Sequence, residues 1–291
     1  MKRRTTGITL KKRSQAGEIW RRLRQNKASM VGLVIIIVVI LMAVFADVIA
    51  PYDYSQQNLA ERFQGPSLKH LFGTDNFGRD IFSRILFGAR ISLKVGLISV
   101  IVSVAIGGTL GAIAAFYGGR TDNIIMRILD VILAIPGMLL AIAIAATLGA
   151  GLSNMMIAIG IGSIPGYARV VRASVLTVKE QDYIEVARSI GASDARIILR
   201  HIILNAMAPI LVQATLGVAG AILSCASLSF LGLGIEPPTP EWGSMLSSTR
   251  QYISQYWWLT AFPGGMIMLT VYALNVLGDG LRDALDPRLK D

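Results

Sequence analysis

The residue types that most often carry catalysis are scarce and scattered in this sequence. The two histidines, His70 and His201, lie far apart, and the single cysteine, Cys225, falls within an apolar run. No spacing typical of a metal-ligand cluster or of a nucleophile with its base is present. The phosphate-binding pattern G-x-x-x-x-G-K-[ST] is also absent, so the chain holds no nucleotide by that route. The sequence therefore predicts no catalytic residue, no metal site and no cofactor in this chain. Cys225 is interpreted as a packing residue.

The most informative charged stretch is a helix-prone segment that begins at Asp182. Asp182 is a candidate N-cap, and Glu185 follows three residues later, which is the spacing of a capping box. Gly191 then interrupts the helical pattern, and Ser193 can cap a second helix. We therefore predict two short helices that meet at Gly191.

The second of these helices is predicted to be amphipathic. Isoleucines recur on one side, while Arg196 and Arg200, four residues apart, lie on the other. Such a segment either lies on lipid headgroups or forms a docking surface for a soluble partner. The residues alone leave both alternatives open.

Composition indicates the surroundings of this segment. The chain has 291 residues, of which 53% are hydrophobic and only 16% charged, whereas soluble domains carry about 25% charge. We predict an all-α polytopic membrane protein with six transmembrane helices. The six apolar stretches lie within residues 28–46, 95–119, 131–168 (two helices with a break at 148–154), 202–235 and 251–278.

Several features of these stretches predict local structure. Pro136 and Pro165 should kink one helix each. An amphipathic helix over residues 81–90 should lie on the membrane surface. Arg127 and Asp130, three apart, can pair with each other. The small residues Ser99, Ser103, Gly107, Gly111 and Ala115 fall at every fourth position and should let another helix approach closely.

Polar side chains in the fifth stretch are the candidates for a water-filled path. They are Gln213, Thr215, Ser224, Ser227 and Ser229. The alternative is that they make hydrogen bonds between helices.

The net charge of +10 is concentrated in one place. Residues 1–27 hold ten Lys or Arg and one acid, Glu18, so this segment alone carries +9. A basic tail before a membrane span indicates an anchor on anionic lipid rather than a nucleic-acid surface. With the N-terminus in the cytoplasm, 21 of the 28 Lys and Arg lie on the cytoplasmic side, as the positive-inside rule requires. This orientation also places Glu185 to Arg200 in the cytoplasm.

The pattern Glu185, Ala187 and Gly191, followed by an apolar run, resembles the coupling loop of ABC importer permeases. That loop has the pattern E-A-A, three residues, G, nine residues, I-x-L-P. Leu204 stands here where Pro is usual, and His201 and Ile203 replace Ile and Leu. Three longer runs, 73–90, 228–246 and 275–288, are similar to the C-type permease subunit of bacterial dipeptide and oligopeptide ABC importers.

The resemblance implies a type I importer fold with one auxiliary helix and a five-helix core. It divides the chain into a basic cytoplasmic tail (1–28), a first transmembrane helix (29–50), an external segment with the interfacial helix (51–94), a core (95–281) and a cytoplasmic tail (282–291). The coupling loop covers about residues 177–204, and Asp182, Glu185, Ala187, Gly191, Ser193, Arg196 and Arg200 are its expected ATPase-coupling residues.

The resemblance also implies the partners. They are a homologous second permease, two cytoplasmic ATPases that bind ATP and Mg, an external peptide-binding protein and the lipid of a bacterial inner membrane. The chain would be a transport subunit rather than an enzyme. Alternatives are an importer of nickel, glutathione or another small solute, a channel or receptor that works without an ATPase, and a membrane enzyme built around Arg127 and Asp130.

Overall fold

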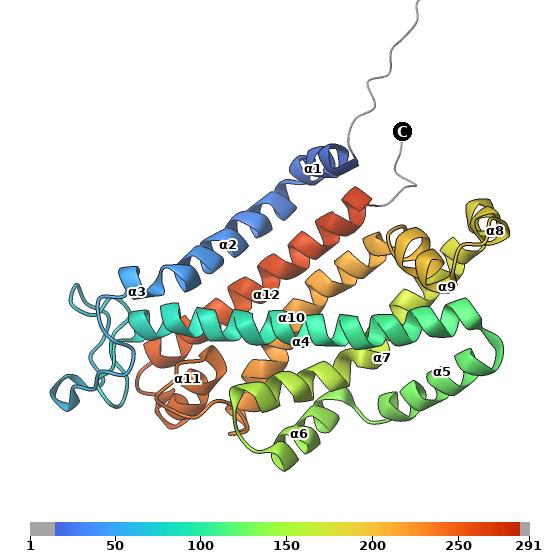
Figure 1. The fold of residues 1–291 in the computed structure, drawn as a ribbon. Coiled ribbons are helices and arrows are strands. Elements are labelled where there is room, and N and C mark those ends of the chain that lie inside the picture. The colour runs from blue at the N-terminus through green and yellow to red at the C-terminus, as the bar shows by residue number, and fades with distance from the viewer. Residues whose placement is uncertain (1–14, 286–291) are drawn as a thin grey trace, which may run out of the picture.

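The computed structural model describes residues 15–285, which form a bundle of helices (Figure 1). Within this part of the chain there is no strand, only an isolated bridge between Thr74 and Asp80. The helices are α1 (Gln15–Gln25), α2 (Lys27–Val44), α3 (Ala46–Ile49), α4 (Ile81–Tyr117), α5 (Gly119–Leu133), α6 (Gly137–Leu148), α7 (Leu152–Lys179), α8 (Asp182–Ser189), α9 (Asp194–Arg196), α10 (Met207–Phe230), α11 (Trp242–Thr249) and α12 (Trp258–Leu285), with short 3-10 turns at Leu59–Glu61 and Arg250–Tyr252 and a π-helical turn at Ile197–Ile202.

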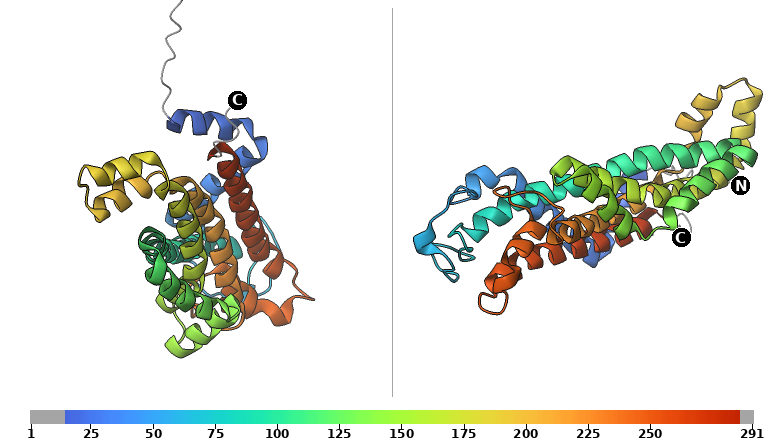
Figure 2. Two further views of the ribbon diagram at one scale, coloured as in Figure 1. Left: turned by 90° about the vertical axis from the view of Figure 1, so that its right-hand side faces the viewer. Right: turned by 90° about the horizontal axis from the view of Figure 1, so that it is seen from below.

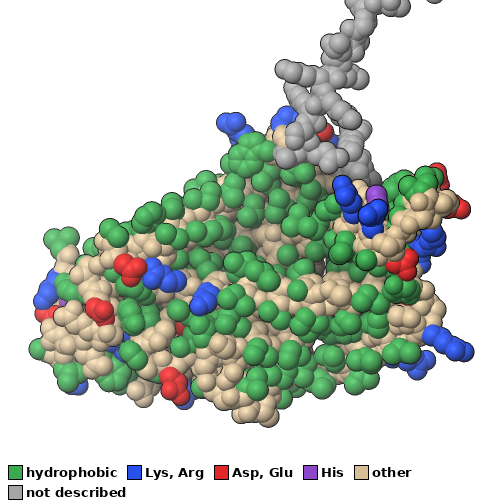
Figure 3. Space-filling model, in the orientation of Figure 1, with side chains coloured by type: hydrophobic (Ala, Val, Ile, Leu, Met, Phe, Trp, Pro, Cys, Tyr) green, Lys and Arg blue, Asp and Glu red, His purple; other side chains and the backbone are tan. Residues whose placement is uncertain are grey.

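The apolar helices confirm a membrane-spanning bundle. Within residues 15–285, α2, α4, α10 and α12 are long and apolar enough to cross a bilayer. The pair α5 and α6, bent by 82° at a short break, makes a fifth span when it is counted as one. Helix α7 has 28 residues but is less apolar, because its second half carries Arg169, Arg172 and Lys179. Figure 3 shows hydrophobic side chains over most of one face and charged side chains gathered toward its two ends.

The two ends of the bundle differ in what they carry. One end, called here the α8 end, holds α8, α9, α1 and the end of α12 (Figures 1 and 2). The other, called here the α3 end, holds α3, α11 and the long segment 51–80. Figure 2 shows that the chain between α7 and α10 projects away from the bundle.

Helices α4 and α7 pack closely because α4 has small residues where they meet. Gly111 faces the Ala168 carbonyl, which would be 2.2 Å from a β-carbon at Gly111. The Ser103 hydroxyl donates to the Gly160 carbonyl at 2.8 Å. The small-residue stripe predicted from the sequence is buried along its length, so its role in helix packing is confirmed.

The predicted surface helix at residues 81–90 is wrong. These residues are the first turns of α4, which runs unbroken for 37 residues. The Asp80 carboxylate caps this helix by accepting from the Ser83 amide at 2.8 Å, and Ile81 and Ile85 are buried. Trp242 is fully buried beside these residues and donates to the Ile85 carbonyl at 3.1 Å. The amphipathic spacing of residues 81–90 predicted that their apolar side contacts lipid, whereas that side packs against other parts of the protein.

The prolines act differently from each other. Pro136 lies in the break between α5 and α6 and therefore ends a helix rather than kinking one, because its ring prevents the preceding turn from continuing. Pro165 lies inside α7, and the kink expected there stays a prediction. The break predicted at residues 148–154 is confirmed, since α6 ends at Leu148 and α7 begins at Leu152.

A buried polar network holds segment 51–80 onto the start of α4. His70 is 2% exposed, and its Nδ1 lies 2.9 Å from the Asp80 carboxylate. Its Nε2 lies 3.3 Å from the Glu61 carboxylate, to which Lys69 also donates. The hydrogen bonds from Lys69 first, and then from His70, lower the pKa of Glu61. Segment 51–80 is thus fixed by charged groups in addition to Phe63 and Phe72, which pack against an apolar cluster.

Candidate functional site

The region predicted from sequence as a docking segment, residues 177–204, lies at the α8 end and is called the 177–204 loop. Helix α8 begins at Asp182, but its N-cap residue is Gln181 and no side-chain capping bond occurs there within the described residues. The predicted capping box is therefore wrong, because Asp182 and Glu185 both lie inside the helix. Both carboxylates still lie in the first turn of α8, where they complement the helix dipole.

Gly191 forms the predicted elbow. Its φ of +80° is in the left-handed region, which glycine adopts without a steric penalty. The Gly191 amide donates to the Arg188 carbonyl at 3.0 Å, and the Ala192 amide donates to the Ala187 carbonyl at 3.1 Å. This pair of bonds is the Schellman motif that ends a helix. The sequence predicted both the position of the elbow and the residue that makes it.

The second helix of the loop is shorter and less regular than predicted. Ser193 occupies the N-cap position of α9 with extended backbone, but its side chain makes no capping bond among the described residues. Helix α9 has three residues and passes into the π-helical turn. Arg196 and Arg200 are exposed. The chain then continues through turns into α10 past Leu204, where the family pattern has proline.

An apolar cluster anchors the loop to the bundle. Ile184 and Ala187 of α8 and Ile197 and Ile202 of the π-helical turn are buried. They pack against Ala112, Ala115 and Phe116 of α4 and Val171 and Val175 of α7. The loop is therefore packed against two long helices, α4 and α7.

A basic residue fixes the loop to the end of α4. The Lys179 ammonium donates to the Phe116 carbonyl at 2.6 Å and to the Ala115 carbonyl at 3.2 Å. These carbonyls belong to the last turn of α4 and have no partner within that helix. The Arg188 guanidinium carbon lies 5.7 Å from the centre of the Phe116 ring, within the range of a cation–π contact.

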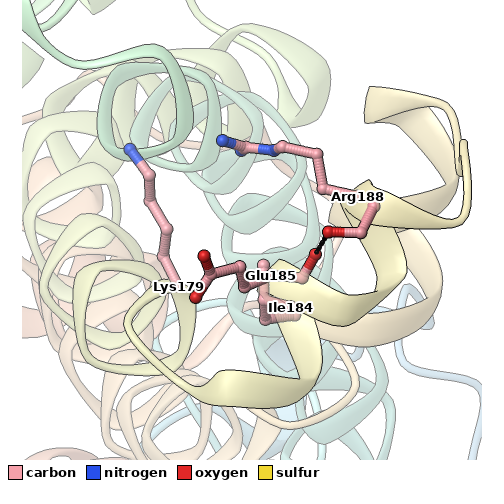
Figure 4. Close-up of a pocket in the computed structure, with 5 residues that line it drawn as sticks. Lys179, Ile184, Glu185 and Arg188 are labelled. Carbon is pink, nitrogen blue, oxygen red and sulfur yellow. Dashed lines mark hydrogen bonds between the residues drawn. The ribbon is translucent and has the colours of Figure 1, made fainter.

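Lys179 and Arg188 also line a pocket. It has a volume of about 390 Å³ and is lined by Lys179, Ile184, Glu185, Arg188 and Ser189. Figure 4 shows Lys179 and Arg188 extending from opposite sides of this pocket, with the Glu185 carboxylate between their helices. Sequence reasoning missed both basic residues. The available signal was a lysine at the end of a helix-prone stretch, because basic side chains near helix ends can bond to terminal carbonyls.

Helix α8 also carries exposed apolar side chains. Tyr183, Val186 and Ile190 follow the spacing i, i+3, i+7 and are 43%, 59% and 79% exposed. Helical spacing places them on one strip of the helix, which adjoins the strip that holds the buried Ile184 and Ala187. One strip of α8 is therefore fixed to the bundle, and the adjoining strip presents large hydrophobic side chains.

The predicted path residues of α10 do not all share one side. Gln213, Ser224 and Ser227 are separated by 11 and 3 positions, so they lie on one side of the helix, whereas Thr215 lies on the opposite side. The hydroxyls of Thr215 and Ser227 donate to carbonyls one turn earlier, each at 2.9 Å. Ser229 is 3% exposed. A path lined by the first three stays a prediction.

Across residues 15–285, no group of three or more His, Cys, Asp or Glu side chains is placed to hold a metal ion. Cys225 is fully buried, which agrees with a packing role.

Comparison with known proteins gives the family. Residues 107–291 match the model of the binding-protein-dependent transport system inner membrane component, and residues 14–66 match the N-terminal TM domain of oligopeptide transport permease C. A dipeptide transport system permease protein DppC from Alkalihalophilus pseudofirmus is 50% identical over 94% of this chain and 90% of its own. The di/tripeptide permease DppC of Pseudomonas aeruginosa is 46% identical over 94% and 92%.

Other relatives carry other substrates in their names. The glutathione transport system permease protein GsiD of Escherichia coli is 51% identical over 94% of this chain and 90% of its own. Among solved structures, the MetNI methionine ABC transporter in an inward-facing conformation matches with a TM-score of 0.57 and 17% identity, over 70% of this chain and 97% of that one. This likeness confirms the predicted type I importer fold. The chain belongs to the family of binding-protein-dependent transport system inner membrane components and is a permease subunit of an ABC importer.

Proposed function

We propose that this permease imports di- or oligopeptides and that a separate ATPase grips it at the 177–204 loop. The observation that carries the docking assignment is the pair of adjoining strips on α8. Ile184 and Ala187 fix it to α4 and α7, while Tyr183, Val186 and Ile190 on the adjoining strip remain exposed. Exposed apolar patches of this kind mark protein or membrane interaction sites, and we assign this one to a protein partner.

Charged side chains lie near the apolar patch, which favours contact with a soluble protein over contact with lipid. Glu185, Arg196 and Arg200 are exposed and would provide polar contacts at the rim of the interface, with Asp182 and Ser193 beside them. Gly191 sets the angle between the two halves of the loop, and Ala187 belongs to the buried anchor. In this arrangement the partner ATPases bind ATP and Mg, and the permease holds neither.

The mechanism follows from the anchoring of the loop. When ATP draws the two ATPases together, each would carry one loop with it. Because the loop is packed on α4 and α7 and continues into α10, its displacement tilts these helices and opens the path outward. An external binding protein would then deliver the substrate, and a homologous second permease would form the other half of the path.

Orientation is part of the proposal. The positive-inside distribution of Lys and Arg supports an orientation with the α8 end and both termini on the cytoplasmic side of a bacterial inner membrane. Peptide as the substrate is supported by the dipeptide and di/tripeptide relatives. The glutathione relatives support a second candidate of related chemistry, since glutathione is itself a modified tripeptide. Identification of the ligand held by the cognate binding protein distinguishes the two.

Single-cysteine labelling tests the orientation. Arg196→Cys should react with a membrane-impermeant maleimide in inverted vesicles and not in intact cells, whereas the control Gln57→Cys should react in intact cells. Background labelling is low because the one native cysteine is fully buried. Reaction of Arg196→Cys from outside intact cells would remove the docking assignment.

Copurification tests the partner. Solubilised in mild detergent, the chain should bring down an ATPase subunit, and the combined substitution of Val186 and Ile190 by serine should release it without preventing membrane insertion. A chain that transports peptide with no ATPase bound would instead be a channel or a secondary carrier.

A further inference from the structure

The basic residues of α1 and the start of α2 outnumber the acids that could pair with them. Within residues 15–27, four basic residues accompany a single acid, Glu18, which leaves a net charge of +3. The bundle balances charge elsewhere by pairing helices. The Arg169 guanidinium of α7 donates to the Asp130 carboxylate of α5 at 2.6 Å; the pairing of Asp130 with Arg127 that spacing predicted is therefore wrong. The excess charge of α1 needs a different explanation.

The sequence of the first span fixes where α1 lies relative to the membrane. Lys27 and Asp47 enclose 19 residues without a charge, which extend about 28 Å at helical rise. A hydrocarbon core is about 30 Å thick, so this span has no spare length and both charged residues lie at its boundaries. Only Asn26 separates α1 from α2. Helix α1 therefore ends at the level of the lipid headgroups.

The corner between α1 and α2 holds α1 across the end of α12 (Figure 2). Asn26 has extended backbone, and its side chain accepts from the Ser29 amide at 3.2 Å. Leu23 is 6% exposed and packs against Leu277 and Ala284 of α12. The chain thus turns at the boundary of the membrane instead of continuing as one long helix. Amphipathic helices in this position lie in the plane of the interface.

Outside its contact with α12, α1 combines an aromatic ring with positive charge. Trp20 is 49% exposed, and Arg21 and Arg24 are exposed as well. Helical spacing places these three side chains within about 100° of one another. Arg22, by contrast, donates to the Glu18 carboxylate at 3.0 Å. Tryptophan favours the interface between lipid and water, and arginine binds phosphate oxygens through paired hydrogen bonds. This exposed side of α1 therefore has the chemistry of a headgroup site.

We propose that the exposed side of α1, together with Lys27 at the corner, binds the headgroup of an anionic phospholipid. Arg21 and Arg24 bind the phosphate, and Trp20 contacts the upper part of an acyl chain. The sequence alone predicted a lipid anchor spread over residues 1–27, of which 1–14 lie outside the described part of the chain. The proposed site is confined to one helix. Because that helix also packs on α12, a bound lipid holds the end of α12 at the membrane surface.

Quenching of Trp20 by brominated lipid tests the site. The chain and the subunits that copurify with it are placed in phosphatidylcholine nanodiscs with the same low fraction of brominated phosphatidylglycerol or brominated phosphatidylcholine. The difference in fluorescence between the unsubstituted chain and Trp20→Phe isolates Trp20, because all other tryptophans are common to both. Brominated phosphatidylglycerol should quench this difference about threefold more, since one engaged basic residue favours anionic lipid about fivefold. High salt should reduce the preference.

Paired variants separate charge from shape and from position. Arg21→Gln with Arg24→Gln should bring the two brominated lipids close to equal quenching, whereas Arg21→Lys with Arg24→Lys keeps the charge and should retain most of the preference. The matched control is Arg120→Gln with Arg127→Gln, which removes two exposed arginines from α5 and should leave the preference unchanged. Quenching by brominated phosphatidylcholine should persist in every variant, because α1 still lies at the membrane.

Three results would overturn the proposal. The first is no quenching of Trp20 by either lipid, as when a protein partner covers this side of α1. The second is equal quenching by both lipids in the unsubstituted chain. The third is a preference that survives Arg21→Gln with Arg24→Gln, or that the α5 control removes equally. None of these results bears on the proposed function, which concerns the 177–204 loop and is tested separately by copurification.

Discussion

Replacement of Lys179 by methionine should uncouple ATP hydrolysis from transport. The Lys179 ammonium is the polar link between the 177–204 loop and the end of α4, through the carbonyls of Phe116 and Ala115. Methionine keeps the length and apolar stem of the side chain but cannot donate. The loop would remain packed by its apolar cluster, while its polar attachment to α4 would be lost.

The size of the effect follows from these two contacts. Hydrogen bonds that involve a charged group contribute about 1.5–3 kcal/mol. The pocket that holds Lys179 is open to solvent, so water can replace part of the interaction and the total should be near 2 kcal/mol, toward the low end of that range. This corresponds to a shift of about 30-fold in the balance between attached and detached loop.

The assay is the number of ATP molecules hydrolysed per peptide imported in proteoliposomes that contain the complete complex. Lys179→Met should raise this number severalfold, up to about 30-fold, with ATPase activity retained. Lys179→Arg, which can still donate to the carbonyls, should stay near the unsubstituted value. Arg188→Met removes only a cation–π contact of about 0.5–1 kcal/mol and should have a smaller effect. An unchanged ratio in Lys179→Met would refute the idea that this link transmits movement.

Three further predictions follow from local geometry. Gly191→Leu should uncouple transport while leaving membrane insertion intact, because leucine at this φ of +80° costs about 1–2 kcal/mol. Gly191→Asn should retain more transport activity, because asparagine tolerates this conformation better. Full transport by Gly191→Leu would contradict the elbow assignment. Gly111→Ala should lower the melting temperature of the purified protein, because the alanine β-carbon would lie 2.2 Å from a carbonyl of α7, at a cost of about 1–3 kcal/mol. The matched control is Gly108→Ala, whose β-carbon would have its nearest contact 3.7 Å away. Equal melting temperatures of the two variants would count against close packing of α4 on α7. Finally, the hydrogen bond from Lys69 lowers the pKa of Glu61 below its ordinary 4.5. This carboxylate therefore stabilises segment 51–80 at neutral pH, and the stabilisation is lost as the pH falls through the lowered pKa. Tryptophan fluorescence should report the loosening of the segment in the unsubstituted chain, and a Glu61→Gln variant that shows the same transition would refute the assignment.

Much of the fold could be predicted from sequence because a bilayer limits the alternatives. Apolar length located four of the six predicted spans, or five when the bent pair α5 and α6 is counted, within residues 15–285. The small-residue stripe from Ser99 to Ala115 identified the side of α4 that packs on α7. Gly191 was predictable because the left-handed conformation strongly favours glycine. In each case one physical requirement determines the residue, whatever surrounds it.

The wrong predictions concern residues whose placement is determined by tertiary contacts. Residues 81–90 are amphipathic in either environment, and only the burial of Ile81 and Ile85 shows that their apolar side faces protein. Asp130 has an arginine at helical spacing and another one on α7, and spacing alone favours the nearer of the two. Lys179 was missed because its partners are backbone carbonyls more than 60 positions away, which leave no mark in the sequence beside it.

The length of α4 gives the molecule a single rigid rod through the membrane. Its 37 residues extend about 55 Å, far more than the hydrocarbon thickness, so both tips reach beyond the lipid. One tip is clamped by Asp80 within the histidine network and the other by Lys179. A tilt imposed at either tip must swing the opposite tip the other way, so events on the two faces of the membrane are mechanically linked through one uninterrupted element.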